Sequence, residues 1–315
     1  MTLRHLKIFL EVADTGKMST AAKNLYITQP SVTQAIHELE SHFHVLLFER
    51  LSRKLYITEA GKLFYGYARQ VVSQYDQLES HMSDHFLTET IRMGATISVG
   101  GSILPDLINQ FEKENPSTNL FVRVTNTRDV EKKLLDMELD VGLVEGNIKS
   151  PDLVVLPMIS DFLVLVCHKD HPFAQKEILY THELKNQHFA MREPGSGTRE
   201  LFEQYLEQYH IPIQTVLEGN TPETLKNAVI HNQVLSVLSF RLIEKELKQG
   251  LVHIFTPVEH NWNRSFSFVY HKDKFLSSSI LSLQNLIKVY GENENLNEVE
   301  TAKLIADPES FSSSC

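Results

Sequence analysis

Near its start, the chain carries two short stripes of apolar residues separated by a small polar break. The members of each stripe recur at steps of three and four, which places them on one face of a helix. The first stripe is Met18, Ala21, Ala22 and Leu25, and the second is Val32, Ala35, Ile36, Leu39 and Phe43. Paired alanines let two helices cross closely, because larger side chains would hold the axes apart. We therefore predict a helix-turn-helix.

Capping residues indicate where both helices begin. Ser19 or an immediate neighbour can cap the first helix, and Thr28 or Gln29 can open the second. Pro30 then falls in the first turn of the second helix, where its missing N–H costs nothing.

The second helix has a polar face opposite its apolar stripe. Glutamine amides pair bidentately with adenine, and serine or threonine hydroxyls bond several base edges. A recognition helix meets the major groove of DNA with its N-terminal residues. The predicted base contacts are Gln29, Ser31, Thr33, Gln34 and His37. The alternative is an ordinary solvated helix face, and these residues alone do not decide between the two.

A basic hairpin is predicted directly after the two helices. Leu51, Leu55 and Ile57 indicate short strands around the tip at 52–54. In a winged helix-turn-helix such a tip lies beside the recognition helix and touches the DNA backbone. The predicted phosphate contacts are Ser19, Arg50, Arg53 and Lys54. The alternative is that the basic residues are solvated turn residues.

One long amphipathic helix is predicted from the N-cap Thr58 to about Phe86, a stretch without proline. An apolar stripe of this length has no body of its own to pack on, so pairing with the same helix of another subunit would bury it. We predict a dimer whose seam contains Phe64, Tyr67, Val71, Leu78 and Met82.

From about Ile91 onward, strand-like runs alternate with amphipathic helices, which predicts a mostly parallel α/β sheet. The runs LVVLPMI and FLVLVCH follow one another with only Ser160-Asp161 between them. We interpret them as two strands at a crossover between two lobes, with a helix around Ser277–Tyr290 returning to the first lobe. The final residues are rich in Glu, Asn and Ser, which is typical of a poorly ordered tail.

These patterns predict four segments. They are a DNA-binding head over 1–58, a linker and dimerisation helix over 59–88, a two-lobed body over 89–291, and a disordered tail over 292–315. Within the body, lobe I is predicted over about 91–160 and 266–291, and lobe II over about 161–265.

The charge distribution supports this division. The chain has 315 residues and a net charge of −10, but residues 1–70 carry +3 and residues 71–315 carry −13. A basic head on an acidic body is typical of a DNA-binding protein with a separate regulatory part. No apolar run approaches the ~18 residues of a membrane span, and the N-terminus is not a secretory signal. We expect a cytoplasmic protein with no membrane partner.

The residues carry a specific resemblance over Met1 to about Tyr290. LRHLKIFLEVADTGKMSTAAKNLYITQPSVTQAIHELE and the later FER, TEAG, DVGLVEG, HKDHP and REPGSGTR elements are similar to those of LysR-type transcriptional regulators. This resemblance implies a winged helix-turn-helix, a linker helix and a type-2 periplasmic-binding-protein-like effector domain. It also implies assembly as a homodimer or homotetramer, with RNA polymerase as a further candidate partner.

Two Gly/Ser-rich segments are candidates for holding an effector. GATISVGGSILP is predicted to turn from a strand through Gly100-Gly101-Ser102 into a helix, and 193–199 is predicted to open a second helix. Two helix N-termini facing each other would bind a small anion. The resemblance implies that Thr96 and Ser98 line the cavity; Gly101, Ser102, Ser196 and Thr198 are further candidates. The alternative is that the glycines form tight turns and the hydroxyls cap helices. Sulfur-compound or amino-acid metabolism is suggested only by the REPGSGTR likeness.

Other classes are less well supported by the residues. Ser196 lies in Gly-Ser-Gly-Thr rather than in a nucleophile elbow, and the GGS turn lacks the lysine of a P-loop. We expect no enzyme, cofactor or metal site. The alternatives are an enzyme or a cytoplasmic small-molecule-binding protein that uses the same cleft.

The chain departs from the family pattern at two places. Residues 230–234 read Ile-His-Asn-Gln-Val where the family has a glycine-containing turn, so the backbone there is expected to differ. His37 stands where relatives often carry a basic residue, which leaves base preference at that position open.

Overall fold

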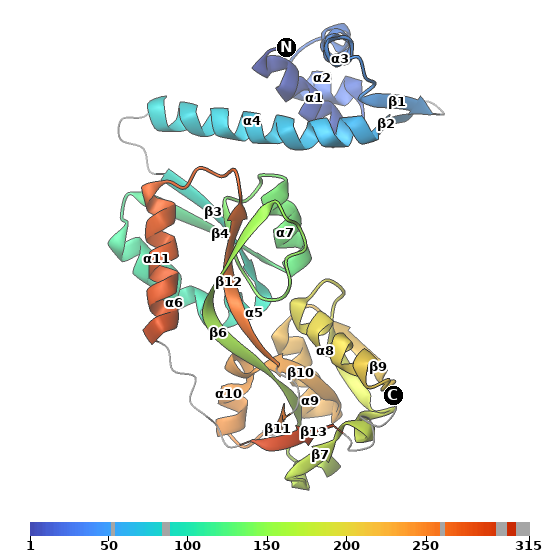
Figure 1. Cartoon of the computed structure of the whole chain (residues 1–315), viewed down its shortest axis with the longest axis vertical. Helices are drawn as coiled ribbons and strands as arrows, with labels where there is room; N and C mark the ends of the chain where they lie inside the picture. The colour runs from blue at the N-terminus through green and yellow to red at the C-terminus, as the bar shows by residue number, and fades with distance from the viewer. Residues whose placement is uncertain (52–53, 84–88, 259–261, 294–300, 307–315) are drawn as a thin grey trace, which may run out of the picture. The chain divides into compact units, whose positions relative to one another are not determined.

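The computed structural model describes residues 1–51, 54–83, 89–258, 262–293 and 301–306. Contacts divide the chain near residue 87 into two compact units. The first unit contains α1 (Leu3–Thr15), α2 (Met18–Asn24), α3 (Gln29–Phe43), β1 (Phe48–Leu51), β2 (Lys54–Ile57) and α4 (Glu59–Ser83) (Figure 1). The predicted winged helix-turn-helix is confirmed.

Local sequence explains the starts of the two motif helices. Thr28 caps α3, where its side-chain oxygen accepts a hydrogen bond from the Ser31 amide, and Pro30 lies in the first turn as predicted. Helix α2 begins earlier than predicted, at Met18, so Lys17 is its N-cap and Ser19 lies inside its first turn.

The first half of α4 belongs to the core of the head. Thr58 accepts a hydrogen bond from the Gly61 amide at 2.9 Å and so caps the helix. Phe64 packs edge-on against Phe9, with ring centroids 4.8 Å apart, and contacts Phe43. Phe64 thus packs within the head as well, although its side chain is only partly buried, and its place in the dimer seam stays a prediction. The side chains of three other predicted seam residues are exposed, and these are Tyr67, Val71 and Leu78. The side chain of Met82 lies outside the described residues.

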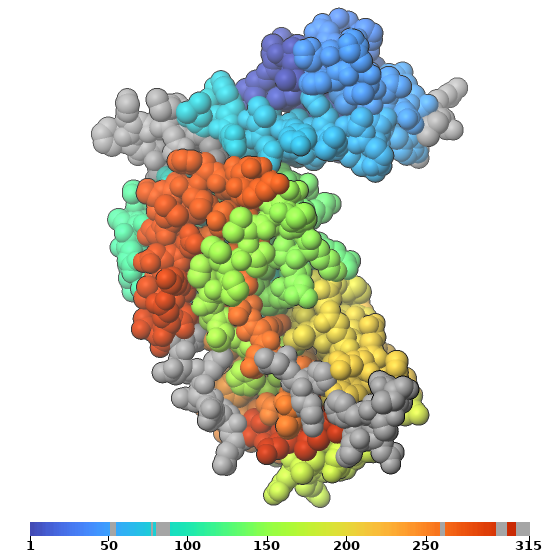
Figure 2. All heavy atoms as spheres, viewed as in Figure 1, coloured from blue at the N-terminus to red at the C-terminus, as the bar shows by residue number. Residues whose placement is uncertain are grey.

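The second unit is a mixed α/β body with two lobes joined by long strands (Figure 1). Lobe I contains β3 (Glu89–Thr96), α5 (Ile97–Ser102), α6 (Leu104–Glu114), β4 (Thr118–Thr125), α7 (Thr127–Leu135), β5 (Val141–Val144) and α11 (Ser278–Asn293). Two strands pass between the lobes, and these are β6 (Leu153–His168) and β12 (Asn263–His271). Helix α11 forms much of the visible surface of lobe I (Figure 2).

Lobe II contains the remaining elements. They are η1 (Pro172–Gln175), β7 (Ile178–Tyr180), η2 (Thr181–Leu184), β8 (His188–Arg192), α8 (Gly197–Gln208), β9 (Gln214–Gly219), α9 (Pro222–Asn232), β10 (Leu235–Ser239), α10 (Phe240–Lys248), β11 (Val252–Pro257) and β13 (Ala302–Ile305). The main strand order through both lobes is β4-β3-β5-β12-β6-β10-β8-β9.

Strand β6 shows how lobe II buries both faces of its sheet. Leu163 and Leu165 pack with α8, whereas Val164 and Val166 pack with α9 and α10. Alternate side chains of a strand point to opposite faces, so a run with no polar positions is buried on both sides.

The two strands predicted around Ser160-Asp161 are one strand. The pairing with β12 continues through both residues, because Ser160 lies opposite Ser265 and Asp161 lies opposite Arg264. A polar pair inside an apolar run indicates a break, but pairing with β12 keeps Ser160 and Asp161 inside the ladder. The predicted break into two strands is therefore wrong, and the predicted lobe boundary at this place stays a prediction.

The prediction of a disordered tail over 292–315 is wrong for its middle part. Helix α11 extends to Asn293, and β13 pairs in parallel with both β11 and β7. Leu304 is fully buried in the apolar cluster of lobe II. Composition suggested disorder because only one short apolar stretch interrupts the polar residues. The other predicted segment boundaries stay predictions.

Two local turns also differ from expectation. The segment 100–102 lies inside α5 rather than in a turn before it, because the strand ends and the helix begins at Thr96. After α9, the left-handed backbone that the family pattern would assign to a glycine is adopted by Gln233, with φ of 54°.

Candidate functional site

Helix α3 presents a polar surface on the head. Its buried side is formed by Val32, Ala35, Ile36 and Leu39. All five predicted base contacts lie on the exposed side, and these are Gln29, Ser31, Thr33, Gln34 and His37. The arrangement is that of a recognition helix whose first turns are free to enter a groove.

The predicted phosphate contacts are only partly described. Ser19 and Arg50 are exposed on the head. Arg53 and the side chain of Lys54 lie outside the described residues. The roles of all these residues remain predictions.

A buried carboxylate that the sequence interpretation missed occupies the predicted anion site. Glu145 follows β5, is 1% exposed, and accepts hydrogen bonds from the hydroxyls of Thr96 and Ser98. The Ser98 bond is 2.9 Å long. The expectation that these hydroxyls donate to an effector anion therefore needs correction, because each hydroxyl has one proton and Glu145 already accepts both. An acidic residue at the carboxyl end of a parallel strand was the available sequence signal.

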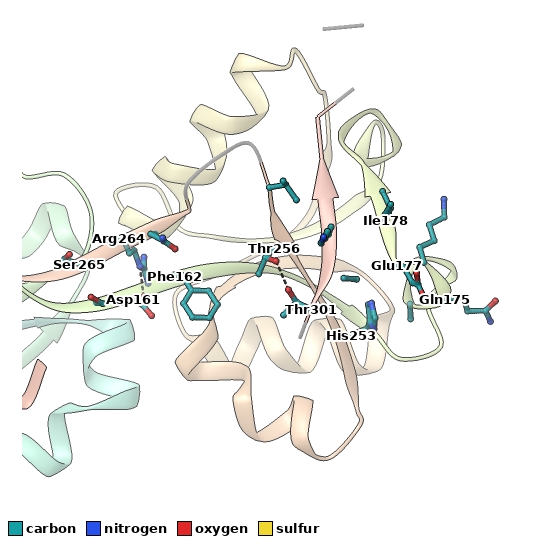
Figure 3. A pocket seen from close by; sticks show the side chains of 17 residues that line it. Asp161, Phe162, Gln175, Glu177, Ile178, His253, Thr256, Arg264, Ser265 and Thr301 are labelled. Atoms are coloured by element: carbon teal, nitrogen blue, oxygen red, sulfur yellow. Dashed lines mark hydrogen bonds and ion pairs between the residues drawn. The ribbon is translucent and has the colours of Figure 1, made fainter. Parts of the chain in front are cut away.

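An arginine between the lobes was also missed. The Arg264 guanidinium donates to Asp161 at 2.7 Å, to the Thr198 hydroxyl at 2.9 Å and to the Ser98 hydroxyl at 3.4 Å. It thereby links α8 of lobe II with α5 of lobe I. Figure 3 shows Arg264 and Asp161 directed toward each other from β12 and β6. No local pattern could predict this contact, since it depends on the register of two distant strands.

Glycines bring the two lobes into backbone contact. A Cβ atom placed on Gly197 would lie 2.8 Å from the Cα of Gly146 and 2.9 Å from the carbonyl oxygen of Glu145. The Arg128 amide of lobe I donates to the carbonyl of Gly195 in lobe II at 3.4 Å. The two lobes are therefore in contact at this edge of the cleft. They can approach this closely because Gly146 and Gly197 have no side chains to separate the end of β5 from the start of α8.

Ser196 lies at the same edge. It is the N-cap residue of α8 and is 2% exposed, yet its Oγ has no hydrogen-bond partner among the described residues. A buried hydroxyl without a partner is costly, so such a group calls for a water or a ligand. The first N–H groups of α8 lie beside it and need acceptors as well.

The other two effector candidates do not line this edge in the predicted way. Ser102 donates its hydroxyl to the carbonyl of Ser98 within α5. Gly101 lies beside Leu242 of α10, so its missing side chain lets α5 approach lobe II.

The hollows of the body differ greatly in size. A hollow of about 10 Å³ lies beside Thr198 and Arg199, which is room for no more than one water. A groove of about 1430 Å³ lies in lobe II (Figure 3). The described residues that line it include Asp161, Phe162, Lys176, His253, Thr256 and Arg264. None of the six predicted effector residues is among them, although Arg264 and Asp161 belong to both places.

Comparison with known proteins identifies the architecture. Residues 3–62 match the model of the bacterial regulatory helix-turn-helix proteins of the lysR family, and residues 85–289 match the LysR substrate binding domain. The chain belongs to the LysR family. The resemblance inferred from the sequence is confirmed, and the protein is a transcriptional regulator with a DNA-binding head and a substrate-binding body.

Individual relatives agree with this assignment. The chain is 30% identical to the HTH-type transcriptional regulator CysL of Bacillus subtilis over 267 residues, which is 84% of this chain and 89% of CysL. A full-length OxyR variant from Pseudomonas aeruginosa matches 95% of this chain and 99% of its own with a TM-score of 0.69 at 22% identity. The CcmR regulatory domain from Synechocystis, solved in complex with 2-PG, matches 65% of this chain and 99% of its own with a TM-score of 0.61 at 23% identity. These two structures establish similarity of fold.

The described residues include neither a candidate membrane helix nor a candidate metal cluster. No described helix combines the length and apolar character that crossing a bilayer requires. Within the same residues, no three His, Cys, Asp or Glu side chains are grouped so that they could hold a metal ion.

Proposed function

We propose that this LysR-family regulator binds a small anionic effector at the closed edge between its lobes. The observation that carries the proposal is the buried, unpartnered hydroxyl of Ser196 at the start of α8. A negative group placed there would accept from this hydroxyl and from the first amides of α8, whose dipole favours an anion. The CcmR regulatory domain, which shares the fold, was solved with 2-PG.

The effector also carries a hydrogen-bond donor in this proposal. The hydroxyls of Thr96 and Ser98 already donate hydrogen bonds to Glu145, so toward a ligand they and the carboxylate offer acceptors. Lobe I thus presents acceptors, whereas α8 of lobe II presents donors. A small oxyanion or carboxylate with an O–H or N–H group fits both sides.

Effector binding requires the lobes to separate at this edge. The backbones of Gly146 and Gly197 are in direct contact there, and the Arg128 amide donates to the carbonyl of Gly195, which leaves no room for a small-molecule ligand. The closed contact of Gly146 with Gly197 and an opened, liganded arrangement would then be two states of the body. The effector shifts their populations by its difference in affinity for them.

The cleft acts in recognition rather than catalysis. The comparisons identify relatives that are transcriptional regulators, and we propose that the ligand leaves unchanged. We also infer that the exposed face of α3 reads bases while Arg50 and the wing contact phosphates. Because DNA is the partner, the protein works in the compartment that holds the DNA.

Thermal shift of the full chain against a panel of small oxyanions and carboxylates tests the effector proposal. A ligand at ~100 times its dissociation constant stabilises by about 2.7 kcal/mol. Ser196→Ala should weaken binding by roughly ten- to a hundredfold, because one hydrogen bond to a charged group contributes about 1.5–3 kcal/mol. Ser117→Ala in an exposed turn is the matched control. Equal affinity of the Ser196→Ala variant and wild type would refute the assignment.

A further inference from the structure

A chain of hydrogen bonds joins helix α1 to the exposed face of α3. Gln34 donates its Nε2–H to Oε1 of Glu38 at 2.8 Å, one helical turn further along α3. The other carboxylate oxygen of Glu38 lies 3.1 Å from Nε2 of His5. Nδ1 of His5 is in turn 3.1 Å from the Thr2 amide. Neither His5 nor Glu38 was among the residues predicted to act on DNA.

The contacts of Thr2 assign the tautomer of His5, because both its amide and its hydroxyl, the latter at 3.0 Å, can donate to Nδ1. A backbone N–H can only donate, so Nδ1 of His5 must accept and the imidazole proton must lie on Nε2. Nε2–H then donates to Glu38. The carboxylate receives one donor from each side, and these donors, the Gln34 amide first, hold the pKa of Glu38 below its usual value.

This arrangement selects one orientation of the Gln34 amide. If the amide were flipped, its carbonyl oxygen would face the Glu38 carboxylate, and two acceptors would repel each other. In the observed orientation, one N–H of Gln34 donates to Glu38. The second N–H and Oε1 do not contact Glu38 and can meet a base. One donor beside one acceptor is the pair that adenine N7 and N6 require.

We propose that Glu38, whose carboxylate also contacts His5, is a positioning residue that holds the Gln34 amide in the orientation that reads adenine. The inference rests on the proposed reading of bases by α3. A simple solvated pair on one helix would not need a partner from α1, whereas here a residue 33 positions away in the chain supports the carboxylate. Glu38 thus makes the free head resemble the bound head at this position, which favours discrimination over general affinity.

The test begins with a pool of random-sequence duplexes and the full-length protein. Sites selected by wild type and by Gln34→Ala identify the base pair that depends on Gln34. Affinities for the selected site and for the same site with that base pair replaced are then measured at one salt concentration. Their quotient is the specificity ratio, and a bidentate contact should make it roughly five- to a hundredfold.

Glu38→Ala should lower this ratio severalfold, and His5→Ala should lower it less. Glu38→Gln should retain most of the ratio, because its side-chain oxygen still accepts from Gln34.

Glu49→Ala on the wing removes the same charge from an exposed site without a contact to Gln34, so it should change both affinities alike and leave the ratio unaltered. In the Gln34→Ala background, Glu38→Ala should have no further effect on the ratio. The dependence of log K on log salt should stay constant throughout, because phosphate contacts are unchanged.

The outcomes separate the two proposals. If Gln34→Ala selects the same sites as wild type, base reading by Gln34 fails, and the positioning role fails with it. If Gln34→Ala loses a base preference that Glu38→Ala keeps in full, only the positioning role is overturned. If Glu38→Ala still lowers the ratio in the Gln34→Ala background, Glu38 reads a base directly and is not a positioning residue.

Discussion

At the scale of single residues, Glu145 changes the chemistry of the cleft. Thr96 and Ser98 are predicted to line the effector cavity, but their hydroxyls donate hydrogen bonds to Glu145, a carboxylate of the protein itself. A buried carboxylate needs such donors, since burial without hydrogen bonds is strongly unfavourable for a charged group. The two hydroxyls therefore stabilise the fold as well as shape the ligand site.

Thr96→Val should consequently destabilise the body by about 1.5–3 kcal/mol, because Glu145 loses one charged hydrogen bond. Urea unfolding should show a lower midpoint with an unchanged slope. Thr215→Val on the exposed strand β9 is the control and should unfold like wild type. An unchanged midpoint for Thr96→Val would mean that this hydroxyl contributes nothing to holding Glu145.

At the scale of elements, α4 has two different halves. Its first turns pack into the head through Phe64 and Ala68, whereas Val71 and Leu78 further along are exposed. An amphipathic stripe in sequence therefore does not say which partner buries which residue. The exposed apolar residues of the second half remain the surface that a second subunit would cover.

Val71→Asp together with Leu78→Asp should dissociate the oligomer, because each subunit would bring two charges into an apolar seam at a cost of several kcal/mol. Sedimentation velocity should show a smaller species. Glu79→Asp on the same helix keeps the charge and serves as control. The seam assignment fails if the double variant sediments like wild type while the control does too.

Strand β13 is the second element whose role can be tested. Leu304→Ala should cost about 2–5 kcal/mol of stability, because a fully buried leucine leaves a cavity in lobe II. Lys303→Ala at the exposed neighbouring position is the matched control. Thermal unfolding of both variants distinguishes a packed strand from a dispensable tail, since a tail would tolerate both changes equally.

At the scale of the whole molecule, burial disfavours the protonated form of three histidines among the described residues of the body. Burial lowers the pKa of His171, of His253 and of His271 below the usual value of 6.5. Near His271, the charges of Asp273 and Asp152 oppose this shift without cancelling it. The unfolded chain therefore binds more protons than the folded chain as the pH falls through about 6.5.

Stability should decrease on acidification for this reason, because a state that binds more protons gains population as protons become available. The contribution is fully present above pH 6.5 and is lost progressively below it. Urea unfolding at pH 7.5 and at pH 5.5 measures the difference. His271→Gln should make the difference smaller, and a variant with the full acid sensitivity of wild type would exclude His271 as a contributor.

Features that depend on near neighbours along the chain could be predicted from the amino-acid sequence. The helices of the head, the cap at Thr28 and the wing strands follow from periods and capping residues within a few positions. The family elements that identified the architecture are also short and ordered along the chain. The exposed polar face of α3 follows directly, because a helix with one apolar stripe leaves its other side to solvent.

Contacts between distant segments could not be predicted, because they depend on how the strands pair in three dimensions. Arg264 meets Asp161 across 103 positions because β12 and β6 pair in one register, and Leu304 is buried because β13 fits between β11 and β7. Glu145 reaches Thr96 and Ser98 through the parallel arrangement of β3 and β5. Local propensity carries no information about register, and a shift of one residue would turn each of these side chains to the opposite face.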